Sequence, residues 1–401
     1  MDQHGPEPIS THEAPVGIIG AGPLGLETAW ALANRGVRSV ILEAGRVGST
    51  MAWWAPGTKY FSSPERIEIC RVPLVTRDQD KATREDYLAY LQQVVGTHSL
   101  DVRTGRRVIR AQRASGGSGD GFVLTTERST EGVGGPSEQA RQTNPTLIPS
   151  PPPIEGGSGV ETWRFESLVL AIGNMHTPRL LGVQGESLPH VSHYLDDPGR
   201  YFGQRVLIVG GRNSAAEAAI RLFRAGARVT ISYRRRVFDH DRLKYWIHPE
   251  LEWLIRKGHL GFEPGTEVSR IDRDAVQLIP SGLEPDSETL EGASPLLAPG
   301  ESRRVEADHV LLLTGYVQSR TLFDQLGVET CGEEHKPRID PKTMQTSVPG
   351  VYIAGTAAGG SQRRTKVFIE TSHVHADRIA AALVGERSDE APPTYGPMEE
   401  S

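Results

Sequence analysis

Two short glycine-rich turns, each lying between two apolar runs, constrain the fold of this chain more than any other feature. The first is Val16-Gly17-Ile18-Ile19-Gly20-Ala21-Gly22-Pro23-Leu24-Gly25, and the second is Val206-Leu207-Ile208-Val209-Gly210-Gly211-Arg212-Asn213-Ser214-Ala215. Each preceding run is short enough to be a buried strand, and each turn opens a segment with the pattern of a helix. This order is typical of a dinucleotide-binding unit, so the sequence predicts an α/β fold with two Rossmann-like dinucleotide-binding domains.

The first turn has a glycine at each position where the motif needs one. Gly20 permits the tight turn, Gly22 lets the backbone approach a pyrophosphate, and Gly25 lets the helix pack close to the strand. Pro23 stands at the expected start of the helix. Glu43 ends the next strand, where a carboxylate accepts hydrogen bonds from a ribose diol and repels a 2′-phosphate. This pattern indicates FAD or NAD and disfavours NADP.

The second turn departs from this pattern in two places. Arg212 stands where the second glycine of the motif is expected, and its guanidinium can pair with pyrophosphate oxygens. The following strand ends in Arg234 and Arg235, which suit a ribose 2′-phosphate, and no acidic residue takes the place that Glu43 has in the first unit. The contrast predicts FAD in the first site and NADPH in the second, although a solvated surface patch of arginines remains an alternative. The residues expected to contact the second dinucleotide are Gly210, Gly211, Arg212, Asn213, Ser214, Arg234 and Arg235.

Further residues are expected near the cofactors because short strands end in glycine next to them. One such strand ends in Ala171-Ile172-Gly173, a second ends in Thr314-Gly315, and a third, from 350, ends in Gly355-Thr356. The cofactor-binding residues predicted here are Ala171, Gly173, Gly315, Gly355 and Thr356, together with Val108 on an expected strand at 106–111. The sequence names no catalytic residue and predicts no metal site.

The order of the elements places the second unit inside the first. We predict that residues 16–187 and 318–390 form the FAD-binding domain and that residues 188–317 form the NADPH-binding domain. A low content of apolar residues predicts disordered tails at 1–15 and 391–401, a low-complexity insertion at 127–160 and a flexible loop at 281–303.

Composition excludes several classes of protein. The net charge of -6 gives no reason to expect nucleic acid or an anionic membrane as a partner, and no apolar stretch is long enough to span a membrane. The first 15 residues lack the hydrophobic core of a secretion signal, so the expected location is cytoplasmic. The two cysteines, Cys70 and Cys331, are too far apart in sequence for a CxxC redox pair, and both are expected to be buried and inert.

Several segments between the motifs resemble one known family. They are 60–69 (Tyr60 to Ile69), 188–194 (Leu188 to Tyr194), 201–205 (Tyr201 to Arg205) and 244–247 (Lys244 to Ile247). Together with both turns they resemble the bacillithiol-disulfide reductase family (YpdA type), a branch of the thioredoxin-reductase-like flavoproteins. The resemblance extends from residue 15 to about 385, apart from the two low-complexity insertions.

The resemblance implies a cytoplasmic reductase that depends on FAD and NADPH and is often a homo-oligomer. It also implies a small-molecule or small-protein electron acceptor, for which a thiol disulfide is one candidate. The chain departs from the family at Leu24, where the family has the cysteine that is its candidate for contacting a disulfide. A second departure is Thr356, where the family's flavin motif has aspartate.

Two alternative functions remain open from the sequence. One is a flavin-dependent monooxygenase, because Gly185 and His190 nearly match that class's fingerprint, although they are one residue out of step and Val183 replaces its phenylalanine. The other is a non-catalytic redox sensor that binds flavin and NADPH, which the departures at Leu24, Arg212 and Thr356 would permit.

Overall fold

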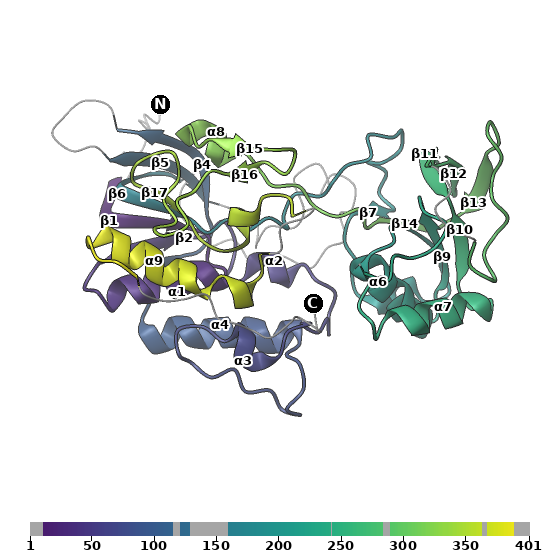
Figure 1. Cartoon of the computed structure of the whole chain (residues 1–401), viewed down its shortest axis with the longest axis horizontal. Helices are drawn as coiled ribbons and strands as arrows, with labels where there is room; N and C mark the ends of the chain where they lie inside the picture. Colours follow the sequence, from purple (N-terminus) through teal and green to yellow (C-terminus); the bar gives the residue numbers. More distant parts are fainter. Residues whose placement is uncertain are drawn as a thin grey trace, which may run out of the picture.

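The computed structural model describes residues 11–114, 121–128, 159–241, 243–283, 289–362 and 367–388. Figure 1 shows two lobes joined by extended chain. No helix among the described residues is long and apolar enough to cross a membrane.

The larger lobe is built on a seven-stranded sheet with the order β3-β2-β1-β6-β5-β4, in which β17 also pairs with β6. Strands β1, β2, β3, β6 and β17 run parallel, whereas β4 and β5 are antiparallel additions at one edge. The strands are β1 (Thr11–Ile19), β2 (Ser39–Leu42), β3 (Val102–Arg103), β4 (Arg106–Arg113), β5 (Phe122–Arg128), β6 (Val160–Leu170) and β17 (Val351–Ile353).

Helices cover this sheet because their apolar faces pack on it. Helix α1 begins at a proline and has nine buried residues among its eleven, as expected for a helix between a sheet and another helix, α9. Thr83 and Asp86 form a capping box that starts α4. The helices of this lobe are α1 (Pro23–Ala33), α2 (Ser49–Ala52), α3 (Pro64–Ile67), α4 (Arg84–His98), α8 (Thr321–Leu326) and α9 (His373–Leu383), with short 3-10 helices η2 (Gly355–Gly359) and η3 (Ile369–Thr371) and a small hairpin of β15 (Thr330–Cys331) and β16 (Lys336–Pro337).

The smaller lobe holds a five-stranded parallel sheet with the order β10-β9-β8-β14-β7 and a three-stranded antiparallel sheet of β11, β12 and β13. Its strands are β7 (Val191–Ser192), β8 (Arg205–Val209), β9 (Arg228–Tyr233), β10 (Gly261–Pro264), β11 (Thr266–Ile271), β12 (Ala275–Pro280), β13 (Arg303–Glu306) and β14 (His309–Leu312). Its helices are η1 (Pro198–Tyr201), α6 (Asn213–Arg224) and α7 (His248–Arg256). Separate apolar clusters fill the two faces of the parallel sheet.

The lobes are joined by two segments that run side by side. Pro178 forms an isolated bridge with Tyr316, and the amide of Arg179 donates to the carbonyl of Gly315 at 2.9 Å. The chain therefore leaves the larger lobe and returns to it at one place, as expected for a lobe inserted in the other. This arrangement agrees with the predicted α/β fold of two dinucleotide-binding units; the exact domain boundaries stay a prediction.

Some elements differ from those that the sequence predicts. Strand β1 begins at Thr11 because Thr11–Ala14 pair with Thr162–Phe165, so residues 11–15 are in a strand where a tail was expected over 1–15. The sequence predicts a last helix at about 366–384, but α9 begins at His373, after η3. The glycine, proline and aromatic residues of 44–76 predict no regular element there, but this segment contains the short helices α2 and α3.

Parts of the segments predicted to be disordered or of low complexity lie outside the described residues. They are 1–10 of the tail at 1–15, 129–158 of the insertion at 127–160, 284–288 of the loop at 281–303, and the whole of 391–401. The described parts of 281–302 contain neither helix nor strand.

Candidate functional site

The first glycine turn lies between the end of β1 and the start of α1. A Cβ on Gly20 would lie 2.5 Å from the carbonyl oxygen of Ala171, and one on Gly25 would lie 2.0 Å from that of Gly20. These two glycines are therefore required by the packing of the backbone alone. Gly22 differs, because a Cβ there would meet nothing within 4 Å. The open space at Gly22 lies at the amino-terminal end of α1, where backbone amides favour an anion.

Glu43, at the end of β2, is buried against the same turn. Its carboxylate accepts hydrogen bonds from the amides of Ala21 and Gly45, both at 2.8 Å, and from the hydroxyl of Ser49 at 2.9 Å. A carboxylate has about four acceptor positions, so at least one remains for a ribose hydroxyl. The negative charge thus stands beside the turn, as predicted, and is fixed there by the turn itself.

The second glycine turn repeats this construction between β8 and α6. A Cβ on Gly210 would lie 2.6 Å from the carbonyl oxygen of Leu313, and one on Gly211 would overlap the ring of Tyr233 at 2.4 Å. Arg212 has an ordinary extended backbone as the residue that precedes α6, so a side chain is tolerated there. The replacement of glycine by arginine therefore costs the turn no backbone strain and adds a cation at the helix start.

The two turns open onto one large cleft of about 1890 Å³. Single small-molecule pockets are roughly 300–1,000 Å³, so this volume suits more than one ligand of dinucleotide size. The predicted residues that line the cleft are Gly20, Gly22, Pro23, Glu43, Val108, Ala171, Gly173, Arg212, Asn213, Ser214, Gly355 and Thr356. The structure thus brings the sites of both lobes together.

Six predicted residues do not line this cleft, for different reasons. Gly25, Gly210 and Gly211 are covered by backbone or by the Tyr233 ring, so they shape the turns from behind. Arg234 is exposed and Arg235 half-buried just after β9, outside the cleft lining. Gly315, with a φ of +91°, forms the turn where the chain returns to the larger lobe.

Contacts between the lobes hold the two turns over the same cleft. The guanidinium of Arg221, on α6, donates to the hydroxyl of Thr58 at 2.7 Å and to the carbonyl oxygen of Pro56. The rings of Trp53 and Tyr194 lie edge to face with centroids 5.8 Å apart. No motif in the sequence singles out Arg221. Its spacing is nonetheless a usable signal, because it lies one turn beyond Glu217 and two turns beyond Ser214, which also line the cleft on this face of α6.

The carboxy-terminal glycine motif is fixed by a histidine of the last helix. The amide of Gly355 donates to Nδ1 of His375 at 3.2 Å. Burial, together with the charges of Arg378 and His373, lowers the pKa of His375 to about 4, so the ring is neutral and Nδ1 can accept a hydrogen bond. His375 therefore positions the backbone beside Thr356 without itself reaching the cleft lining.

Neither cysteine lies in the cleft. Cys70 is buried, and burial and the nearby Glu27 raise the pKa of its thiol. Cys331 is exposed, contrary to the expectation that both thiols are buried, and it lies in the β15–β16 hairpin. Leu24 lines the cleft at the position of the family's cysteine, and its side chain lies close to Gly355. The cleft lining contains no thiol.

The near match to a monooxygenase fingerprint has a structural explanation. A Cβ on Gly185 would lie 1.9 Å from the carbonyl oxygen of Ile271, so this glycine is required by close backbone packing against β11. Neither Gly185 nor His190 lines the cleft. Their spacing therefore gives no support for that class.

Comparison with known proteins agrees with this geometry. The family described as pyridine nucleotide-disulphide oxidoreductase matches residues 17–131 and 158–355. The chain is 29% identical to the bacilliredoxin reductase Bdr of Bacillus subtilis (strain 168) over 91% of this chain and 96% of that protein. It is 26% identical to a ferredoxin–NADP reductase of Ignicoccus hospitalis over 86% of this chain and 90% of that protein.

A solved structure shows the same arrangement of lobes. The bacillithiol disulfide reductase Bdr (YpdA) from Bacillus cereus superposes with a TM-score of 0.76 at 28% identity and covers 93% of this chain and 99% of its own. The predicted resemblance to this group of thioredoxin-reductase-like flavoproteins is confirmed, as are FAD and NADPH as the cofactors. The chain belongs to the pyridine nucleotide-disulphide oxidoreductase family and is an NADPH-dependent flavoprotein oxidoreductase.

Proposed function

We propose that this enzyme uses NADPH to reduce a low-molecular-weight disulfide, and that no cysteine of its own takes part. The observation that carries the proposal is a single cleft onto which both nucleotide turns open and whose lining contains no thiol. The named activity of the Bacillus cereus neighbour, a bacillithiol disulfide reductase, supports a disulfide as the acceptor.

The residues of the first turn fit FAD. The open space at Gly22 gives a pyrophosphate room against the start of α1, while Glu43 keeps an acceptor position for the ribose. Thr356 offers a hydroxyl and an amide at the cleft where the family has aspartate, and Gly355 is fixed there by His375. When bound, FAD supplies the two-electron chemistry that links NADPH to the acceptor.

The residues of the second turn fit NADPH. Arg212 and the amides of Asn213 and Ser214 would hold the pyrophosphate at the start of α6. Arg234 and Arg235 would hold the 2′-phosphate at the end of β9. The overall reaction consumes one NADPH, one proton and one disulfide, and yields NADP⁺ and two thiols.

Aromatic rings would shield the reaction from water. Trp53, Tyr194 and Tyr316 line the cleft where the two lobes meet. Burial raises the pKa of Tyr316 to about 12, so this phenol is neutral at physiological pH and brings no charge into the cleft. A cytoplasmic location, a homo-oligomeric state and the absence of nucleic-acid binding stay predictions from the sequence.

The test is NADPH oxidation by the FAD-loaded enzyme with four kinds of acceptor: low-molecular-weight disulfides including bacillithiol disulfide, a ferredoxin, a quinone and oxygen. We expect a disulfide to be the best acceptor, with two thiols formed per NADPH. The double variant Cys70→Ser/Cys331→Ser should keep the wild-type rate. Loss of disulfide reduction in this cysteine-free variant would contradict the proposed direct route, and preference for ferredoxin or for oxygen-dependent hydroxylation would contradict the acceptor.

A further inference from the structure

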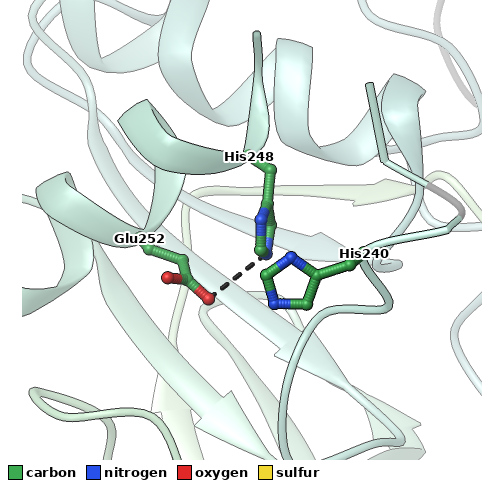
Figure 2. Close-up of side chains that lie close together, drawn as sticks. All are labelled: His240, His248 and Glu252. Atoms are coloured by element: carbon green, nitrogen blue, oxygen red, sulfur yellow. Dashed lines mark ion pairs between the residues drawn. The ribbon is translucent and has the colours of Figure 1, made fainter. Parts of the chain in front are cut away.

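A cluster of two histidines and a glutamate lies in the smaller lobe, away from both glycine turns. His248 and Glu252 stand four residues apart on α7, which places them on one face of the helix, and His240 reaches them from the segment after β9. Figure 2 shows the ring of His248 between the carboxylate of Glu252 and the ring of His240. One ligand atom of each residue lies within 4.8 Å of the other two.

The ring of His248 has an unusual environment for a buried polar group. The residue is 5% exposed, and its Nε2 makes no hydrogen bond within the described structure. Nε2 nonetheless lies 3.2 Å from Oε1 of Glu252, without hydrogen-bond geometry. Buried polar atoms nearly always have a partner, so an unsatisfied nitrogen aimed at a carboxylate and a second imidazole calls for one.

The spacing of these atoms is compatible with a metal ion that they share. Two ligands that each lie about 2.0–2.1 Å from a tetrahedral zinc are roughly 3.3 Å apart. The distance of 3.2 Å between His248 Nε2 and Glu252 Oε1 agrees with this value. The rings of His240 and His248 lie edge to face with centroids 3.9 Å apart, and His240 is exposed, so a small side-chain rotation completes the set.

The charges around the cluster are compatible with a cation. His248 is buried with its Nε2 facing the carboxylate of Glu252, and a neutral imidazole in this position can donate its lone pair to a metal. The other carboxylate oxygen of Glu252 lies 3.3 Å from the guanidinium of Arg256. This ion pair with an exposed arginine holds the carboxylate on the face of α7. Oε1 is thereby left directed at the two rings.

We propose that His240, His248 and Glu252 form a zinc site that ties His240, which follows β9, to α7. Two imidazoles and one carboxylate are a ligand set that zinc commonly takes, with water in the fourth position. Although no metal-ligand spacing is recognisable in the sequence, the tertiary structure brings the three residues together.

The proposed site has a consequence for the cleft. The neighbours of His240 in sequence, Asp239 and Asp241, line the cleft, and the amide of Lys244 donates to Oδ1 of Asn213 at 2.9 Å. A metal on His240 would restrain this segment where it meets the second glycine turn. Bound zinc should therefore tighten NADP⁺ binding, an effect that rests on the proposed NADPH site at this turn.

The first experiment is calorimetric titration of the chelator-treated, FAD-loaded enzyme with Zn²⁺, followed by X-ray absorption of the complex. We expect one ion per chain and a shell of nitrogen and oxygen at about 2.0–2.1 Å. The variants His240→Ala and Glu252→Gln should each weaken binding by roughly 100-fold, since even changes beyond the ligands cost about 10–100-fold. His259→Ala removes an imidazole of the same lobe outside the cluster and should bind zinc like the wild type.

His240 is exposed, so its variant is expected to fold even if substitution of the buried His248 is not tolerated. No binding by the wild type, or binding that His240→Ala leaves unchanged, would overturn the site. These outcomes are independent of disulfide reduction, which the proposed function predicts with or without zinc.

The second experiment measures the affinity for NADP⁺ with and without saturating Zn²⁺. We expect zinc to tighten NADP⁺ binding by about fivefold or more, and NADP⁺ must then tighten Zn²⁺ binding by the same factor. An unchanged NADP⁺ affinity would overturn the coupling to the cleft, and His240→Ala should abolish any effect of zinc.

Discussion

At the scale of single residues, two glycines of the first turn lack a side chain for different reasons. Gly25 must be glycine for the fold, because its Cβ would lie 2.0 Å from the carbonyl oxygen of Gly20. Gly22 has a φ of -80° and open space around its Cβ position, so the folded chain without ligand would accept alanine there. A substitution at Gly22 therefore affects flavin binding, whereas a substitution at Gly25 affects folding.

Substitution of these glycines should therefore give two distinct results. Gly22→Ala should fold with the melting temperature of the wild-type apoprotein but retain little flavin, because the methyl group would occupy the space of the pyrophosphate. Gly25→Ala should lose stability by several kcal/mol, about the upper range for a single substitution. Flavin absorbance per protein and thermal unfolding of the apoprotein measure both effects. A fully yellow Gly22→Ala protein would show that FAD lies elsewhere.

A second residue-scale feature is the pair of His373 and Glu27, which joins α9 to α1. Nδ1 of His373 lies 2.9 Å from a carboxylate oxygen of Glu27, and Nε2 lies 3.0 Å from the carbonyl oxygen of Arg66. Burial lowers the pKa of His373, but the hydrogen bond and charge of Glu27 outweigh it and raise the pKa to about 8. The protonated ring donates at both nitrogens.

The raised pKa of His373 predicts a pH-dependent stability. The contribution is fully present below the unfolded-state pKa of about 6.5 and is lost as the pH rises through about 8. The loss between pH 6 and pH 9 should be at most about 2 kcal/mol in the free energy of unfolding, measured by urea denaturation. His373→Gln should be less stable at pH 6 and lack this decline. An equal decline in both proteins would assign it to other groups.

At the scale of secondary-structure elements, the end of β9 is the place where we propose that the preference for NADPH over NADH is set. Arg234 is exposed directly after the strand, and no acid stands there. In the larger lobe the equivalent strand end carries Glu43, whose carboxylate accepts hydrogen bonds from the amides of Ala21 and Gly45. Two strand ends of opposite charge on otherwise similar units would direct FAD to one unit and NADPH to the other.

Replacing the cation at the end of β9 should therefore change cofactor preference. Arg234→Ala should weaken NADPH binding by about 1.5–3 kcal/mol, roughly 10- to 100-fold, and leave NADH nearly unchanged, because only NADPH has the 2′-phosphate. Arg228→Ala removes an exposed arginine at the other end of the same strand and is the matched control. Binding constants for both nucleotides and both variants test this. Equal losses for NADPH and NADH would defeat the assignment.

At the scale of the whole molecule, function depends on how the two lobes are held together. The guanidinium of Arg221, on α6, donates hydrogen bonds to Pro56 and Thr58 of the larger lobe. It thereby connects the second nucleotide unit to the larger-lobe side of the cleft. Reactants must lie within about 3–3.5 Å for hydride transfer, so a small shift of one lobe has a large effect on rate.

Arg221→Ala should slow flavin reduction by NADPH by about tenfold or more and change the affinity for NADP⁺ little, because it alters alignment rather than binding. Anaerobic stopped-flow absorbance measures the rate. Arg224→Ala is the control: it lies one turn further along α6, and its partner Glu250 belongs to the smaller lobe. A slower rate in both variants would indicate a general effect on α6.

The sequence predicted the repeated units well because their signals are local. Strand β8 contains the apolar run Val206–Val209 that precedes the second turn. Gly20, Gly25 and Gly210 have the close backbone contacts that require glycine, and Gly22 has open space beside it. The bounds of other strands differ from the predicted ones, because pairing with a neighbouring strand decides where a strand begins. Thr11–Ala14 join β1 through their partners in β6, which no local pattern near residue 11 indicates.

By itself the sequence determined the two nucleotide-binding units and the charge at each strand end, because neighbours along the chain supply glycine, acid and base. Only the tertiary structure decided that both turns share one cleft, that Arg221 bridges the lobes, that Cys331 is exposed, and that His240 meets His248 and Glu252. Such contacts join residues from separate elements, and the packing of the lobes sets them rather than any spacing along the chain.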